Sequence, residues 1–166
     1  NAEKLLKKAI VINFNFAEAH NNLGNVFLAL SKYDEAIASY QNAIKIKQDF
    51  SEPYSNLAFV YLKLNKYQEA ISSYNNSIDI NPNNEISHYN LGNIFHKLGK
   101  KDDAIFCYQK AIEIKPIYAK AHNNLGFVFQ ELFKYDEAIA SYQNAIKINP
   151  NYIKAYINYA NILQQI

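Results

Sequence analysis

The chain has 166 residues, a net charge of +2 and one cysteine, so it is long enough to bury a core but has no internal disulfide. All 17 basic residues are lysines scattered among 15 acids, which argues against a nucleic-acid surface, since that would need a basic stripe and usually arginine. No apolar run approaches the roughly 20 residues of a membrane-spanning helix and no signal peptide is visible, so we expect a cytoplasmic protein with no membrane or nucleic-acid partner.

The sequence repeats itself with a period of 34 residues. Residues 32–46 read KYDEAIASYQNAIKI, and residues 134–148, three periods later, read the same. A shift of 34 also aligns columns of leucine, alanine and tyrosine: Leu23, Leu57, Leu91 and Leu125; Ala36, Ala70, Ala104 and Ala138; Tyr40, Tyr74, Tyr108 and Tyr142. A fixed period of this length is typical of solenoid proteins.

In chain order, residues 1–16 fit the second helix of a partial repeat and residues 153–166 fit the first helix of another. Between them lie four full repeats at 17–50, 51–84, 85–118 and 119–152. Each full repeat predicts two helices, because apolar or small residues recur at spacings of three and four. In the first repeat these are His20, Leu23, Gly24, Phe27 and Leu30 for the first helix, then Ala36, Tyr40, Ala43 and Ile44 for the second. Acids open the second helix, and Pro82, Pro116 and Pro150 follow its last turn.

This pattern resembles the tetratricopeptide repeat family over the whole chain. The family's Leu-Gly pair is present as Leu23–Gly24, Leu91–Gly92 and Leu125–Gly126, and its aromatic, Ala, aromatic, Ala and Pro positions follow in order. Two departures are His or Tyr at the usual leading Trp, and Gln48 in place of one Pro. The resemblance implies an all-α, right-handed superhelical solenoid of antiparallel helix pairs, whose concave groove is lined mainly by first helices and binds peptides.

Helix geometry predicts which face is free to bind. At about 100° per residue, the side of the first helix opposite its apolar stripe carries polar and small side chains. In the first repeat these are Glu18, Asn21, Asn22, Asn25, Leu28 and Ala29. We expect this face to be the working surface.

One column on that face is asparagine in every repeat, at Asn22, Asn56, Asn90, Asn124 and Asn158. An amide carries donors and an acceptor, so it can pair with the backbone of an extended peptide whatever the peptide's side chains. Each hydrogen bond contributes only about 1 kcal/mol, so apolar anchors are also needed. A neighbouring column alternates between asparagine and phenylalanine. The predicted peptide-binding residues are Asn22, Asn25, Asn56, Phe59, Asn90, Asn93, Asn124, Phe127 and Asn158. The alternatives are that the asparagines are merely solvated and that the phenylalanines pack on the flank of the next helix.

No catalytic, metal or cofactor site is expected. His20, His88 and His122 share one repeat column and should lie about 10 Å apart, too far to bind one zinc ion. Cys107 replaces a serine of the other repeats and is interpreted as structural. No phosphate-binding loop, nucleophile elbow or pair of catalytic carboxylates is present.

These features favour a non-catalytic scaffold that binds an extended peptide in the concave groove through an asparagine ladder. An alternative is the substrate-recognition arm of a larger enzyme, because the ladder and the runs NNLGNVF and NLGNIF resemble the repeat region of O-linked N-acetylglucosamine transferase. That resemblance implies that the five column asparagines grip a substrate backbone. RNA binding by helical-hairpin repeats is a third class, disfavoured by the rigid period and the absence of arginine. The first and last helices each lack a partner, so head-to-tail self-association is also expected.

Overall fold

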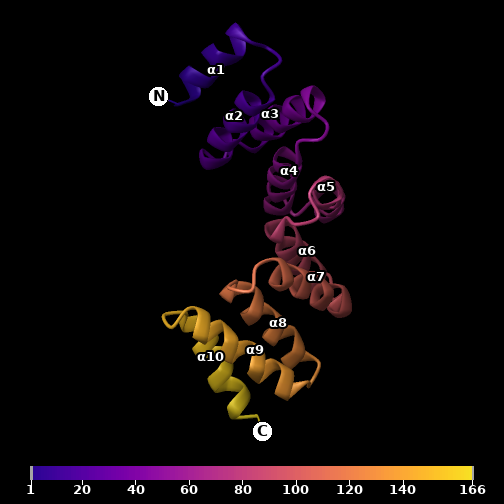
Figure 1. Ribbon diagram of the computed structural model, residues 1–166, viewed down its shortest axis with the longest axis vertical. Helices are drawn as coiled ribbons and strands as arrows, with labels where there is room; N and C mark the ends of the chain where they lie inside the picture. The colour runs from indigo at the N-terminus through magenta and orange to yellow at the C-terminus, as the bar shows by residue number, and fades with distance from the viewer. Residues whose placement is uncertain (1, 166) are drawn as a thin grey trace. The chain divides into compact units, whose positions relative to one another are not determined.

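The computed structural model describes residues 2–165, and within that range it contains ten α-helices and no strand (Figure 1). The helices are α1 (Ala2–Ile12), α2 (Ala17–Ala29), α3 (Tyr33–Ile46), α4 (Ser51–Lys63), α5 (Tyr67–Ile80), α6 (Glu85–Lys97), α7 (Lys101–Ile114), α8 (Ala119–Glu131), α9 (Tyr135–Ile148) and α10 (Ile153–Leu163). The all-α solenoid class predicted from the sequence is confirmed.

Two compact units make up the chain, residues 1–82 with α1–α5 and residues 83–166 with α6–α10. Within each unit, every helix packs against the next one along the chain. First helices of neighbouring repeats also meet, α2 with α4 in one unit, and α6 with α8 and α8 with α10 in the other. This second set of contacts positions the candidate site.

A buried tyrosine holds each helix pair together. Tyr40, Tyr74, Tyr108 and Tyr142 are at most 1% exposed. In the first repeat the ring lies directly on Gly24, where a Cβ would stand 2.5 Å from Tyr40 Cε1. Glycine is needed there because the two helices approach too closely for a side chain.

A left-handed residue closes the first helix of each of the four full repeats. In the first repeat it is Ser31, with φ of 57°, and the Lys32 N–H then donates to the Phe27 carbonyl at 2.9 Å. This bond satisfies a carbonyl that the helix end would otherwise leave without a partner. The equivalent residues are Asn65, Gly99 and Phe133, so the turn keeps its geometry with four different side chains.

Candidate asparagine-lined binding face

All five column asparagines lie on first helices, and they are not equally accessible. Asn22 on α2 is exposed, whereas the other four are half-buried. Asn22 makes no hydrogen bond to the described residues, so its amide is free to donate and to accept.

The Asn56 amide is bound to the preceding repeat. Its Nδ2 donates to Asn21 Oδ1 and to Asn25 Oδ1, each at 3.1 Å, and both acceptors lie on α2. Both amide protons are therefore used within the protein. No donor among residues 2–165 contacts Asn56 Oδ1, so this side chain can accept a hydrogen bond from a ligand but has no proton left to donate.

The same linkage recurs in the second unit. Asn124 Nδ2 donates to Asn93 Oδ1 at 2.9 Å and to the Tyr89 hydroxyl at 3.2 Å. Asn158 Nδ2 donates to Asn123 Oδ1 at 3.0 Å. In all three cases, at Asn56, Asn124 and Asn158, the amide donates to the residue 35 positions earlier. The asparagine column therefore also has a structural role, because in these three cases it links a repeat to the one before it.

Asn25 and Asn93 join this linkage to the core. Asn25 Oδ1 accepts from the Tyr40 hydroxyl at 2.8 Å, and Asn93 Oδ1 accepts from the Tyr108 hydroxyl at 2.9 Å. Burial raises the pKa of Tyr40 and Tyr108, so both hydroxyls stay protonated and donate. Each of these asparagines therefore connects its own helix pair to the next repeat.

Where the column holds phenylalanine, the linkage changes. Phe127 offers no acceptor, and the Tyr142 hydroxyl donates instead to Gln130 Oε1 at 2.8 Å. In the fourth repeat, phenylalanine at this position therefore moves the acceptor of the buried tyrosine from the asparagine column to Gln130.

One placement from helix geometry is wrong. Asn21 was expected on the free face, but it is 2% exposed and donates to Glu52 Oε1 at 2.9 Å. Its counterpart Asn123 is fully buried. The reason is that α4 packs over this side of α2, a contact between repeats that the periodicity of a single helix does not contain.

The two phenylalanines keep part of their surface open. Phe127 is 38% exposed, and its ring stands edge-on to His96 at a centroid distance of 5.6 Å. Phe59 is half-buried, with Lys63 Nζ 5.1 Å from its ring centroid. Asn90 is half-buried, and its Oδ1 receives a long contact of 3.5 Å from Asn93 Nδ2.

Two histidines and the cysteine make other contacts. His20 Nε2 is 3.2 Å from the Phe14 carbonyl, and His122 Nε2 is 3.0 Å from the Pro116 carbonyl. Cys107 is buried, and burial together with the nearby Asp103 raises its pKa to about 12. Within residues 2–165 no cluster of three metal-ligating side chains occurs, and no helix there is long and apolar enough to cross a membrane.

Solved structures resemble the chain closely in fold. The crystal structure of MamA superposes with a TM-score of 0.82 at 24% identity, covering 92% of this chain and 89% of that one. YrrB, a TPR protein described as having an unusual peptide-binding site, gives 0.82 at 22% identity, with 96% and 82% covered. MamA from Desulfovibrio magneticus RS-1 gives 0.81 at 19% identity, with 90% and 84% covered. These likenesses show the fold.

Family models match most of the sequence. A model described as TPR repeat matches residues 24–65, 60–99 and 92–132, and one described as tetratricopeptide repeat matches residues 119–152. No curated protein sequence matches the chain. The family matches run without a gap from residue 24 to residue 152, and the chain belongs to the tetratricopeptide repeat family.

Proposed function

We propose that the first-helix face of each unit binds an extended peptide, and that the chain is a protein-interaction scaffold with no catalysis of its own. The family is one of protein-interaction modules, and YrrB, which shares the fold, is described as having a peptide-binding site. The observation that carries the proposal is the Asn56 amide. Its oxygen contacts no donor among residues 2–165, while its protons are donated to Asn21 and Asn25.

This arrangement makes the proposed face a set of acceptors rather than of paired donors and acceptors. Asn56 accepts from a peptide N–H, and Asn124 keeps one lone-pair direction after accepting from Asn123 Nδ2 at 3.2 Å. Asn22 alone among these three retains its amide protons. Backbone hydrogen bonds contribute about 1 kcal/mol each, so Phe59 and Phe127 supply the apolar contacts that raise the affinity.

A display library of random 12-residue peptides, selected against the whole chain, tests the proposal. We expect peptides bound to the first unit to lose about tenfold in affinity on Asn22→Ala, and peptides bound to the second unit to lose about tenfold on Phe127→Asn. Neither substitution should lower the melting temperature. Both substitutions spare the hydrogen bonds within residues 2–165, because Asn22 makes none there and asparagine already occupies the Phe127 column in the first and third repeats. Lys4→Ala on α1 is the control, and its affinity should stay at that of the parent. Failure to enrich any peptide, or equal binding by all variants, would refute the proposal.

A further inference from the structure

Exposed apolar surface of the first unit is concentrated in residues 2–16, which form α1 and the loop before α2. The large apolar side chains exposed in this segment are Leu5, Val11, Ile12, Phe14 and Phe16. Among the other described residues of the unit, only Leu30 is of this kind. Val11 is 85% exposed, so it contributes almost nothing to the core. Packing within the unit therefore does not explain these side chains.

The same segment is basic, although the rest of the unit is acidic. Lys4, Lys7 and Lys8 stand against one acid, Glu3, whereas residues 17–82 carry five lysines and seven acids. Lys7 pairs with Glu3 inside the helix, at an Nζ–Oε1 distance of 2.7 Å. Lys4 and Lys8 are exposed. Positive charge and exposed apolar surface therefore occur together in one short segment.

Several of these positions face solvent even in a complete repeat. Four positions are exposed in all four full repeats, namely those of Lys4, Lys7, Val11 and Phe14. At the position of Val11 the full repeats carry charged residues, which are Lys45, Asp79, Glu113 and Lys147. At the position of Phe14 they carry glutamine or proline, as Gln48, Pro82, Pro116 and Pro150. None carries lysine at the positions of Lys4 and Lys7. At these solvent-facing positions, residues 2–16 therefore carry both more positive charge and more apolar surface than the full repeats do.

The lysines and Val11 lie on one side of α1. Leu6 and Ile10 pack against the apolar core of the first unit. At about 100° per residue, Lys4, Lys8 and Val11 fall within about 60° of one another on the opposite side of the helix. This side is therefore an outer face on which ammonium groups and an apolar side chain stand together.

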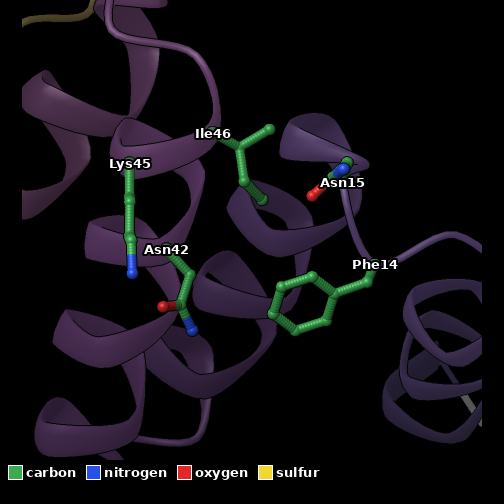
Figure 2. Close-up of a pocket in the computed structure, with 5 residues that line it drawn as sticks. All are labelled: Phe14, Asn15, Asn42, Lys45 and Ile46. Atoms are coloured by element: carbon green, nitrogen blue, oxygen red, sulfur yellow. The ribbon is translucent and has the colours of Figure 1, made fainter.

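Phe14 extends this face into the loop. Its ring is 71% exposed and points toward Asn42 of α3 across a pocket of about 520 Å³ (Figure 2). Val11 lines a neighbouring pocket, of about 510 Å³, that also includes Asn42. Val11 and Phe14 therefore flank one side chain of α3 and lie on the same side of the unit.

We propose that residues 2–16 form an amphipathic segment that docks on an anionic lipid surface. Val11 and Phe14 enter the boundary between headgroups and acyl chains, while the Lys4 ammonium stays at the level of the headgroup phosphates. A basic helix with large apolar side chains is typical of such segments. A protein partner fits less well, because lysine is depleted at the core of protein interfaces. A helix that lies in a lipid surface needs no apolar run of about 20 residues, which only a spanning helix requires.

Vesicle sedimentation of the whole chain tests the proposal. The probes are phosphatidylcholine vesicles with about 30% phosphatidylserine and vesicles of phosphatidylcholine alone, at low salt. At about 1 mM lipid we expect at least about fivefold more chain bound to the anionic vesicles, and this excess should fall as salt is added. No binding to the anionic vesicles, or equal binding to both kinds, would overturn the proposal.

Two double variants separate the apolar from the electrostatic contribution. Val11→Lys with Phe14→Gln introduces the residues that the first full repeat carries at these positions. It raises the net charge, yet it should lower binding by about tenfold, because the apolar contact is lost. Lys4→Glu with Lys8→Glu should also lower binding by at least about tenfold. Unchanged or tighter binding by the first variant would mean that charge alone attracts the chain, and the proposal would fail.

A matched charge reversal in the second unit is the control. Lys120→Glu with Lys154→Glu introduces the residue found at Glu18 and Glu52 in the same column, with the same change in net charge as the reversal on α1. It should leave vesicle binding within about twofold, since charge distant from the lipid contact is screened. Equal losses in the two reversals would refute docking through α1.

Sedimentation without lipid distinguishes a second copy of the chain as the occupant. If the parent chain binds no anionic vesicle and its self-association is lost on Val11→Lys with Phe14→Gln, the face belongs to another copy and the proposal is overturned. If that variant does not fold, spin-labelled lipid in the anionic vesicles gives an independent answer on the parent chain. It should broaden the amide NMR signals of Val11 and Phe14 before those of α3, and uniform broadening would contradict the proposal.

Discussion

Replacing Asn93 tests whether the column of Asn25 and Asn93 links the repeats. Asn93 Oδ1 accepts from the Tyr108 hydroxyl and from Asn124 Nδ2, both at 2.9 Å. Tyr108 is 1% exposed, so Asn93→Ala leaves its hydroxyl buried without this acceptor, at a cost of about 1–3 kcal/mol. Loss of the bond from the half-buried Asn124 adds about 1 kcal/mol. We therefore expect the free energy of unfolding to fall by about 2–4 kcal/mol.

Urea unfolding followed by circular dichroism measures this change. Asn90→Ala is the matched control, since Asn90 is half-buried on the same helix but makes only the long 3.5 Å contact, and it should cost less than about 0.5 kcal/mol. Adding Tyr108→Phe to Asn93→Ala removes both partners of the buried bond, so the double variant should lose about 1 kcal/mol less than the sum of the single losses. Equal effects of Asn93→Ala and Asn90→Ala, or strict additivity in the cycle, would show that the linkage carries no stability.

Other contacts of the chain give four further predictions. Phe127→Asn gives Tyr142 the acceptor that Asn25 gives Tyr40, so the unfolding free energy should hold or rise by up to about 1 kcal/mol, and a loss above that size would contradict it. Burial raises the pKa of Tyr40 and Tyr142, so the folded state should lose stability as pH rises above about 10. The urea midpoint should therefore fall over this range, and an unchanged midpoint would contradict the raised pKa values. Cys107, with a pKa of about 12, should react with a disulfide reagent at pH 8 at least about 100-fold more slowly when folded than in urea. We also propose head-to-tail association through α10, where Ala160 is exposed although tyrosine rings cover Gly24, Gly92 and Gly126 in the same column. Sedimentation should show association that Ala160→Lys abolishes, and a monomeric parent chain at high concentration would refute the proposal.

The helix pairs were predictable because the residues that pack the two helices together lie within one 34-residue repeat. Gly24 and Tyr40 lie 16 residues apart, and a small residue and a tyrosine recur at this spacing in every full repeat, so the sequence alone indicated which faces meet. The all-α solenoid class followed from the same repeated positions. Contacts inside a pair need no knowledge of how one repeat rests on the next.

The hydrogen bonds between repeats were not predictable by that route. The burial of Asn21 and the bond from Asn56 depend on α2 meeting α4, which a helical projection of one pair does not contain. A signal was present all the same. Asn25 and Asn93 stand beside buried tyrosines that need an acceptor, and Phe59 and Phe127 alternate with them. Reading that alternation together with the column of Asn56 would have indicated a shared acceptor.

The hydrogen bond from Asn56 to Asn25 also affects where a repeat array can be divided when its segments are transferred to another protein. A segment excised at the repeat boundary between residues 50 and 51 takes the donor away from its acceptor, even though both helix pairs remain whole. The smallest transferable module therefore begins midway along one first helix and ends midway along the next. A graft with these boundaries includes both the donor and the acceptor of the bond between repeats. A graft joined in the loops depends on the acceptor that the host repeat supplies.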